Sequence, residues 1–100
     1  MKSMAETSQN DLARLHIWVS GRVQGVGFRM FVQQAGTMFG LAGWVHNLGY
    51  DQVETVAEGQ RDILQRFSEV VKTGPRASRV DESREEWETP TREFERFEVR

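Results

Sequence analysis

Apolar residues recur at two different spacings in the first half of the chain. From Ala13 to Ser20 apolar and polar residues alternate, which is the period of a half-buried strand. Between Phe28 and Phe39 the apolar residues recur at i, i+3, i+4, i+7 and i+11, the period of an amphipathic helix. The pattern therefore predicts a strand followed by a helix, with Gly40 placed to end the helix.

The second half continues with a hairpin, a helix and two further strands. Residues 42–48 and 52–58 predict two strands that pair through a turn at Gly49-Tyr50-Asp51. Residues 60–73 predict a second helix, which Gly74-Pro75 ends. Residues 77–88 are rich in charge and predict a fourth strand that is exposed or bulged, and residues 94–99 predict a short last strand.

This order, β-α-β-β-α-β with a short final strand, predicts an α+β fold. Two helices would pack on one face of an antiparallel sheet in the ferredoxin-like sandwich. Residues 1–11 are polar and without period, so we expect a flexible N-terminal tail before one domain at residues 12–100. Many unrelated functions use this fold, so the fold alone assigns none.

Composition narrows the classes of function. The chain has 100 residues and no cysteine, which excludes disulfides, thiolate metal sites and a cysteine nucleophile and fits a reducing cytoplasm. We find no apolar run long enough for a signal peptide or a membrane span. The net charge of −2 argues against non-specific binding to nucleic acid.

Acidic residues occur only in the first 11 residues and in the second half of the sequence. Residues 12–50 contain no Asp or Glu but contain Arg14, Arg22 and Arg29, whereas residues 51–100 contain 13 acids and 9 bases. A region without carboxylates suits an anionic ligand, because nothing in it repels the ligand's charge.

A glycine-rich run, Gly21-Arg22-Val23-Gln24-Gly25-Val26-Gly27-Phe28-Arg29, joins the first strand to the first helix. A loop that turns tightly into a helix N-terminus presents unpaired backbone N–H groups, and such a concavity binds phosphate. Arg29 could add a two-point contact. A plain strand–turn–helix corner fits the same spacing, and the dinucleotide fingerprint is not met because Met30 follows where it needs a glycine.

That run and the later sequence Gly43-Trp44-Val45-His46-Asn47-Leu48 together closely resemble the acylphosphatases, from about Leu12 to Arg100. The resemblance implies the ferredoxin-like fold and hydrolysis of acyl phosphates to a carboxylate and inorganic phosphate, with no metal and no cofactor. It implies that Arg29 binds the phosphate and Asn47 positions the water, with the phosphate taking the water's proton. The implied substrate-binding loop consists of Arg22, Val23, Gln24, Gly25, Val26, Gly27, Phe28 and Arg29.

Two positions depart from the family's pattern. His46 stands where the family often has a basic residue, and Gly49-Tyr50-Asp51-Gln52 replaces a turn that commonly contains Asp-Gly. Neither removes a residue that the implied mechanism requires. The residues themselves offer no Ser-His-Asp pattern, and we interpret His16 as a surface residue and Glu54 as a solvated acid.

The expected partners are a small acyl phosphate and the product phosphate, with no nucleic acid and no membrane, and we expect a cytoplasmic monomer. The loop and Arg29 would hold the phosphoryl end, so the acyl group leaves little trace in the sequence.

Two alternatives remain at this point. An RNA-recognition module has the same order of elements, and residues 25–31 faintly resemble its RNP1 motif. That motif must lie on a strand, whereas Phe28 and Phe31 have helical spacing, and the sequence pI of about 5.7 is acidic. Acylphosphatase-like domains also occur within larger carbamoyl-transferring maturation proteins, which a chain of this length does not favour.

Overall fold

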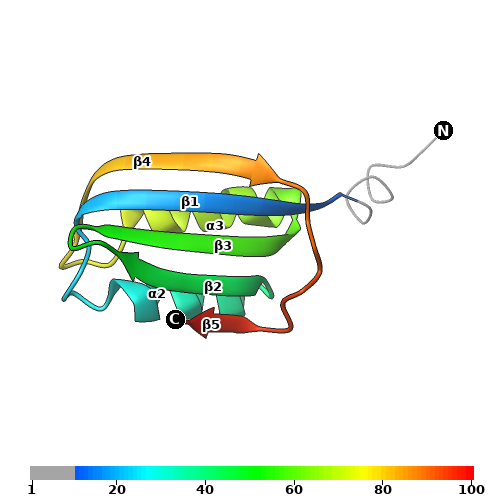
Figure 1. Ribbon diagram of the computed structural model, residues 1–100, viewed down its shortest axis with the longest axis horizontal. Coiled ribbons are helices and arrows are strands. Elements are labelled where there is room, and N and C mark those ends of the chain that lie inside the picture. The colour runs from blue at the N-terminus through cyan, green and yellow to red at the C-terminus, as the bar shows by residue number, and fades with distance from the viewer. Residues whose placement is uncertain (1–10) are drawn as a thin grey trace.

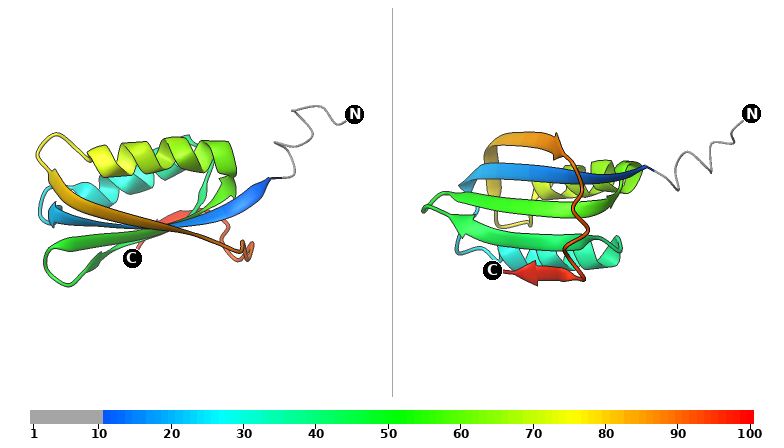
Figure 2. Two further views of the ribbon diagram at one scale, coloured as in Figure 1. Left: turned by 90° about the horizontal axis from the view of Figure 1, so that it is seen from above. Right: turned by 45° about the vertical axis from the view of Figure 1, so that its right-hand side comes forward.

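The computed structural model describes residues 11–100, so the predicted tail lies outside the described residues except for Asp11. The elements are β1 (Leu12–Arg22), α2 (Phe28–Met38), β2 (Ala42–Leu48), β3 (Gln52–Gln60), α3 (Arg61–Thr73), β4 (Arg79–Glu88) and β5 (Phe97–Val99). Figure 1 shows the sheet in front of both helices, and the view from above in Figure 2 shows that the helices lie on one side of it. The predicted ferredoxin-like sandwich is confirmed.

The five strands form one sheet in the order β4-β1-β3-β2-β5. β4, β1, β3 and β2 pair antiparallel with their neighbours, as predicted, whereas β5 pairs parallel with β2. The last pairing follows from the path of the chain. β4 ends at the end of the sheet where β2 begins, and residues 89–96 cross to the opposite edge there, so β5 runs back beside β2 in the same direction (Figure 1).

The core lies between the sheet and the two helices. The alternating apolar residues of β1 all face it and are buried, as the period of two predicts. The helices contribute their own apolar faces. The largest buried side chains on them are Phe28 and Val32 of α2 and Leu64, Phe67 and Val71 of α3. Burial of this apolar surface is the main force that holds the two layers together.

Several predicted boundaries shift. β1 continues past Ser20 through Gly21 and Arg22, so the first part of the glycine-rich run is strand. The pairing of β1 with β4 changes register between Ser20 and Gly21, and most of β4 is exposed, which confirms an exposed, irregular strand. β5 begins only at Phe97, where its pairing with β2 starts. Phe94 lies in the crossing segment, with the centre of its ring 5.3 Å from Cζ of Arg14.

Gly36 lets β5 dock against α2. A glycine here is expected to weaken the helix by up to about 1 kcal/mol relative to alanine. Yet Gly36 is buried, and a Cβ atom at this position would lie 2.3 Å from the ring of Phe97. The absence of a side chain therefore makes room for the Phe97 ring, and the following residues of β5 run along α2 toward its N-terminus.

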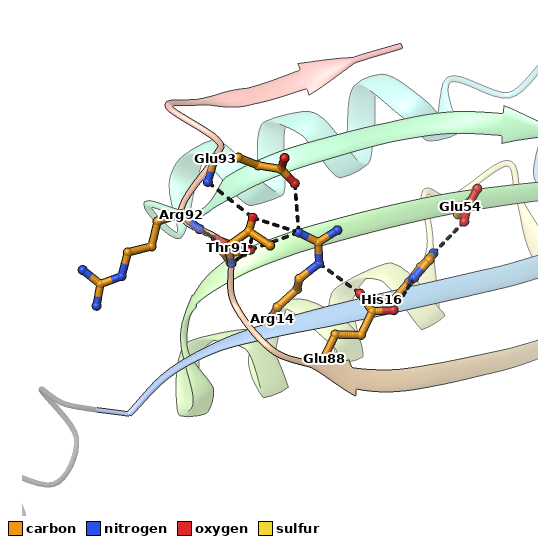
Figure 3. Close-up of polar contacts among 8 residues, drawn as sticks. Arg14, His16, Glu54, Glu88, Thr91, Arg92 and Glu93 are labelled. Atoms are coloured by element: carbon orange, nitrogen blue, oxygen red, sulfur yellow. Dashed lines mark hydrogen bonds and ion pairs between the residues drawn. The ribbon is translucent and has the colours of Figure 1, made fainter.

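Ionic contacts on the other face of the sheet hold the crossing segment in place. Arg14 donates hydrogen bonds to Glu88 at 3.0 Å and to Glu93 at 3.2 Å (Figure 3). It donates another to Glu58 at 3.1 Å. The nearly buried carboxylate of Glu58 also accepts the backbone N–H groups of Thr91 and Arg92, both at 2.8 Å. These contacts fix the route of residues 89–96 and so the position of β5.

Two histidines share the same face with a carboxylate. The ring of His16 lies 2.6 Å from Glu54 and 2.8 Å from Glu88, and His46 also lies 2.6 Å from Glu54. The interpretation of His16 as a surface residue and Glu54 as a solvated acid was wrong: both have partners, because the sheet brings β1, β2 and β3 side by side. Burial raises the pKa of Glu54, but the imidazoles of His46 and His16 outweigh it and leave the pKa below its usual value.

We expect Glu58→Gln to destabilise the fold by about 2 kcal/mol at pH 7, because it removes the charge from a buried, hydrogen-bonded carboxylate. Burial alone raises the pKa of Glu58, but the N–H groups of Thr91 and Arg92 and the guanidinium of Arg14 lower it below its usual 4.5. A lowered folded-state pKa stabilises the fold above the unfolded pKa, and this stability is lost as the pH falls. The difference between the two proteins should therefore shrink below about pH 4.5.

Urea denaturation at pH 7 and pH 3.5 measures this difference. Glu95→Gln removes an exposed acid from the same segment and should change little at either pH. An equal loss of stability at both pH values for Glu58→Gln would contradict the explanation.

Candidate active site

The loop between β1 and α2 presents backbone N–H groups to solvent. Gly25 and Gly27 have φ angles of 74° and 76°, a left-handed conformation that other residues rarely adopt. Gly27 caps α2 without a side-chain hydrogen bond, and the first turn of the helix has no acid. Within residues 11–100, no acceptor is found for the N–H groups of residues 24–28. This arrangement is a ready site for an anion.

Arg29 lies in the first turn of α2 with its side chain exposed. Its guanidinium makes one long contact, 3.5 Å from Nη1 to the backbone oxygen of Arg100. None of the ion pairs among the described residues involves it, in contrast to Arg14 on the other face. No residue of this part of the chain occupies its other donors, which are therefore available to a ligand.

Asn47 is the second last residue of β2. Its side chain points to the helix side of the sheet, because it lies two residues after the buried Val45 and successive side chains alternate. The residue is half-buried, and among the described residues its amide has no hydrogen-bond partner. It thus reaches beyond the edge of the core toward the start of α2.

Arg29 and Asn47 line the same hollow, which has a volume of about 230 Å³. The loop contributes to its wall as well. Of the residues that the resemblance implies, the lining includes Val23, Gly25, Gly27, Phe28, Arg29 and Asn47. In Figure 1 the loop, the start of α2 and the β2–β3 turn all lie at the left-hand end of the molecule. Segments distant in sequence therefore meet at one site.

Three of the implied residues do not line this hollow. Arg22 is exposed at the end of β1, and the half-buried Val26 packs against the core. Gln24 donates hydrogen bonds from its amide nitrogen to the backbone oxygens of Gly49 at 3.0 Å and Gln52 at 2.9 Å. Gln24 thus ties the loop to the β2–β3 turn that follows Asn47.

Two residues of the lining were not among the implied ones, Met30 and Val99. Met30 follows Arg29 directly at the start of the predicted helix, so the sequence alone could have placed it beside the site. Val99 could not be found in this way, because its position depends on the parallel pairing of β5 with β2.

The hollow has the electrostatics that an anion needs. No lining residue is acidic, and Arg29 is the one charged residue among them. Larger hollows of about 340 and 510 Å³ are lined in part by acids, Glu82 in the first and Asp62, Glu69 and Glu85 in the second. Another of about 350 Å³ is almost wholly apolar and has no cation in its lining. Carboxylates in the first two would repel a phosphate, so size alone does not choose the site.

Other kinds of site are not formed by the residues that the structure describes. Residues 11–100 contain no group of three or more His, Asp or Glu side chains arranged to hold a metal ion. Phe28 lies on α2 and is buried, so the residues that resemble an RNP1 motif do not lie on a strand. Among the helices of residues 11–100, none is long and apolar enough to span a membrane.

Known proteins are similar to this chain over most of its length, including the residues that line the hollow. The family model described as Acylphosphatase matches residues 15–99. The acylphosphatase of Trichormus variabilis is 44% identical over 84 residues, which is 84% of this chain and 83% of the relative. That of Syntrophobacter fumaroxidans is 44% identical over 89 residues, 89% of this chain and 92% of the relative. A crystal structure of acylphosphatase from Bacillus subtilis superposes with a TM-score of 0.83 at 41% identity, covering 87% of this chain and 97% of that one.

Proposed function

The chain belongs to the acylphosphatase family and is an acylphosphatase enzyme, and from this premise we propose that Arg29, Asn47 and the glycine-rich loop carry out its reaction. The observation that supports this assignment is the hollow that Arg29 and Asn47 line together with the loop. The substrate is an acyl phosphate, and the products are a carboxylate and inorganic phosphate.

In the proposed complex the phosphoryl group lies against the N-terminus of α2. Backbone N–H groups of the loop and the fork of donors of Arg29 bind its oxygens, and no lining carboxylate opposes them. Phosphoryl transfer needs mainly positioning and stabilisation of charge on these oxygens. Donors that are already in place stabilise that charge in the transition state without reorganisation.

The proposed role of Asn47 is to orient the attacking water. Its amide can accept one hydrogen bond from the water and donate another to the phosphate. The water attacks phosphorus in line with the acyl oxygen, the bond from phosphorus to that oxygen breaks, and the electron pair leaves on the carboxylate. A carboxylate with a conjugate acid of pKa about 4 to 5 leaves without protonation. The proton of the water passes to a phosphoryl oxygen, so the step requires no general base from the protein.

Residues of the loop that do not line the hollow would support its shape. Arg22, Val26 and Gln24 flank the glycines, and Gln24 links the loop to the turn that follows Asn47.

We propose further that the enzyme acts as a cytoplasmic monomer. The lack of cysteine fits a reducing compartment, and sedimentation of the purified protein tests the oligomeric state.

We expect the purified protein to hydrolyse benzoyl phosphate without added metal and in the presence of a chelator. The fall in ultraviolet absorbance measures the rate, and inorganic phosphate should inhibit competitively because it binds the same donors. Absence of hydrolysis above the rate in buffer would overturn the proposed function.

A further inference from the structure

One wall of the hollow is apolar and exposed. Met30 is 54% exposed and Val99 is 39% exposed, and both side chains line the hollow beside Arg29 and Asn47. Large apolar side chains at the surface are ordinary when single. Here two of them border the hollow that Arg29 and Asn47 line together with the glycine-rich loop, which makes their exposure relevant to a ligand.

Different parts of the fold bring these two residues together. Met30 follows Arg29 in the first turn of α2. Val99 pairs with Val45 across β2 and β5 and faces the helix side of the sheet, two residues after the buried Phe97. Because Phe97 packs on Gly36 of α2, the chain from Phe97 onward runs along that helix toward its N-terminus.

The hollow has a charged part at Arg29 and an uncharged part at Met30 and Val99. Arg29 is the one charged residue in its lining, and the proposed function commits it to the phosphoryl group. The volume of about 230 Å³ leaves room for a small group besides the phosphate. A second anionic group on the acyl side would meet Met30 and Val99, and no cation of the lining would compensate for its lost hydration.

We propose that this enzyme selects acyl phosphates whose acyl group is apolar and uncharged, and that Met30 and Val99 bind that group. The proposal rests on the proposed function, since it takes the phosphate to lie against Arg29. Apolar acyl groups gain affinity by covering these exposed side chains, because apolar surface is then removed from water.

The test compares benzoyl phosphate with 4-carboxybenzoyl phosphate, two aromatic substrates that differ by one carboxylate. Each rate is divided by the rate of hydrolysis in buffer, which removes the difference in leaving group. We expect kcat/KM to favour benzoyl phosphate by about tenfold or more. Met30→Lys places a cation beside the acyl group, so the ratio should fall by about tenfold and most of the change should be in KM. Val99→Lys, on a different element, should lower the ratio as well.

Met38→Lys is the matched control. Met38 is the last residue of the same helix, is 88% exposed and does not line the hollow, so its substitution should leave the ratio unchanged. Hydrolysis of both substrates at equal kcat/KM, or a ratio that Met30→Lys and Val99→Lys leave unchanged, would overturn the selection of acyl groups. Failure to hydrolyse either substrate would instead overturn the proposed function, so the two failures are distinct.

Discussion

Arg29→Ala is expected to reduce kcat/KM for benzoyl phosphate by about 10²- to 10³-fold, because one preorganised donor to developing charge contributes about 3 to 4 kcal/mol. The expectation follows from what surrounds the residue. Among the described lining residues it has the one charged side chain, and no side-chain carboxylate of residues 11–100 pairs with it; its one contact is the long one to the backbone oxygen of Arg100. A guanidinium kept free of ion pairs has its donors available for the phosphoryl oxygens. Alanine leaves only the backbone N–H groups to bind them.

Binding of inorganic phosphate should weaken in the same variant. Phosphorus NMR titration or calorimetry measures it separately from turnover. Arg29→Lys keeps the charge but loses the planar fork, so it should recover part of the binding and little of the turnover. The exposed Arg66 of α3 supplies the control, because Arg66→Ala removes the same side chain far from the loop and should behave as wild type. If Arg29→Ala binds phosphate as tightly as wild type, Arg29 is not the phosphate anchor.

The sequence predicted the helices and strands that are encoded by a pattern within one short segment. The alternation in β1 and the helical spacing that begins at Phe28 are properties of short segments, and both elements form where the pattern indicates. The glycine-rich run also predicted its own geometry, because Gly25 and Gly27 take the left-handed conformation that glycine allows. Arg29 and Asn47, 18 positions apart in the chain, line one hollow because β2 runs beside the start of α2.

What the sequence did not predict depends on distant pairing. The short last strand was predicted, but its parallel pairing with β2, which brings Val99 to the site, was not, because no local pattern marks a partner 54 positions earlier in the chain. The contacts of Glu54 with His16 and His46 likewise join three strands. Gln24 had the expected position in the loop, but its contacts with the β2–β3 turn became visible only in the structure.

The departures at His46 and the turn can now be placed relative to the site. His46 points to the opposite face of the sheet from Asn47, where it contacts Glu54 and Trp44. The turn at residues 49–51 offers the backbone oxygen of Gly49 to Gln24, so it supports the loop through its backbone. Both departures therefore alter the surroundings of the hollow while its lining stays as the proposed mechanism requires.

Asn47→Ala is expected to lower kcat for benzoyl phosphate by about 10²- to 10³-fold while inorganic phosphate still binds within a few-fold of wild type. The reason lies in the different tasks of the two polar residues of the hollow. The phosphate would be held by Arg29 and the loop, which this substitution leaves intact. The water would lose the one side-chain amide of the lining that can orient it for in-line attack. Turnover and phosphate affinity should therefore separate in this variant, whereas both fall in Arg29→Ala.

Substitutions at Asn47 leave the fold in place, because the side chain is half-buried at a strand end and has no hydrogen-bond partner within residues 11–100. Asn47→Asp is similar in size but carries a negative charge, which repels the phosphate, so it should lose binding as well as turnover. Gln34→Ala removes an exposed amide from α2 outside the hollow and should keep wild-type kcat. A wild-type kcat in Asn47→Ala would show that another group positions the water, because removal of the amide that orients it must slow the attack.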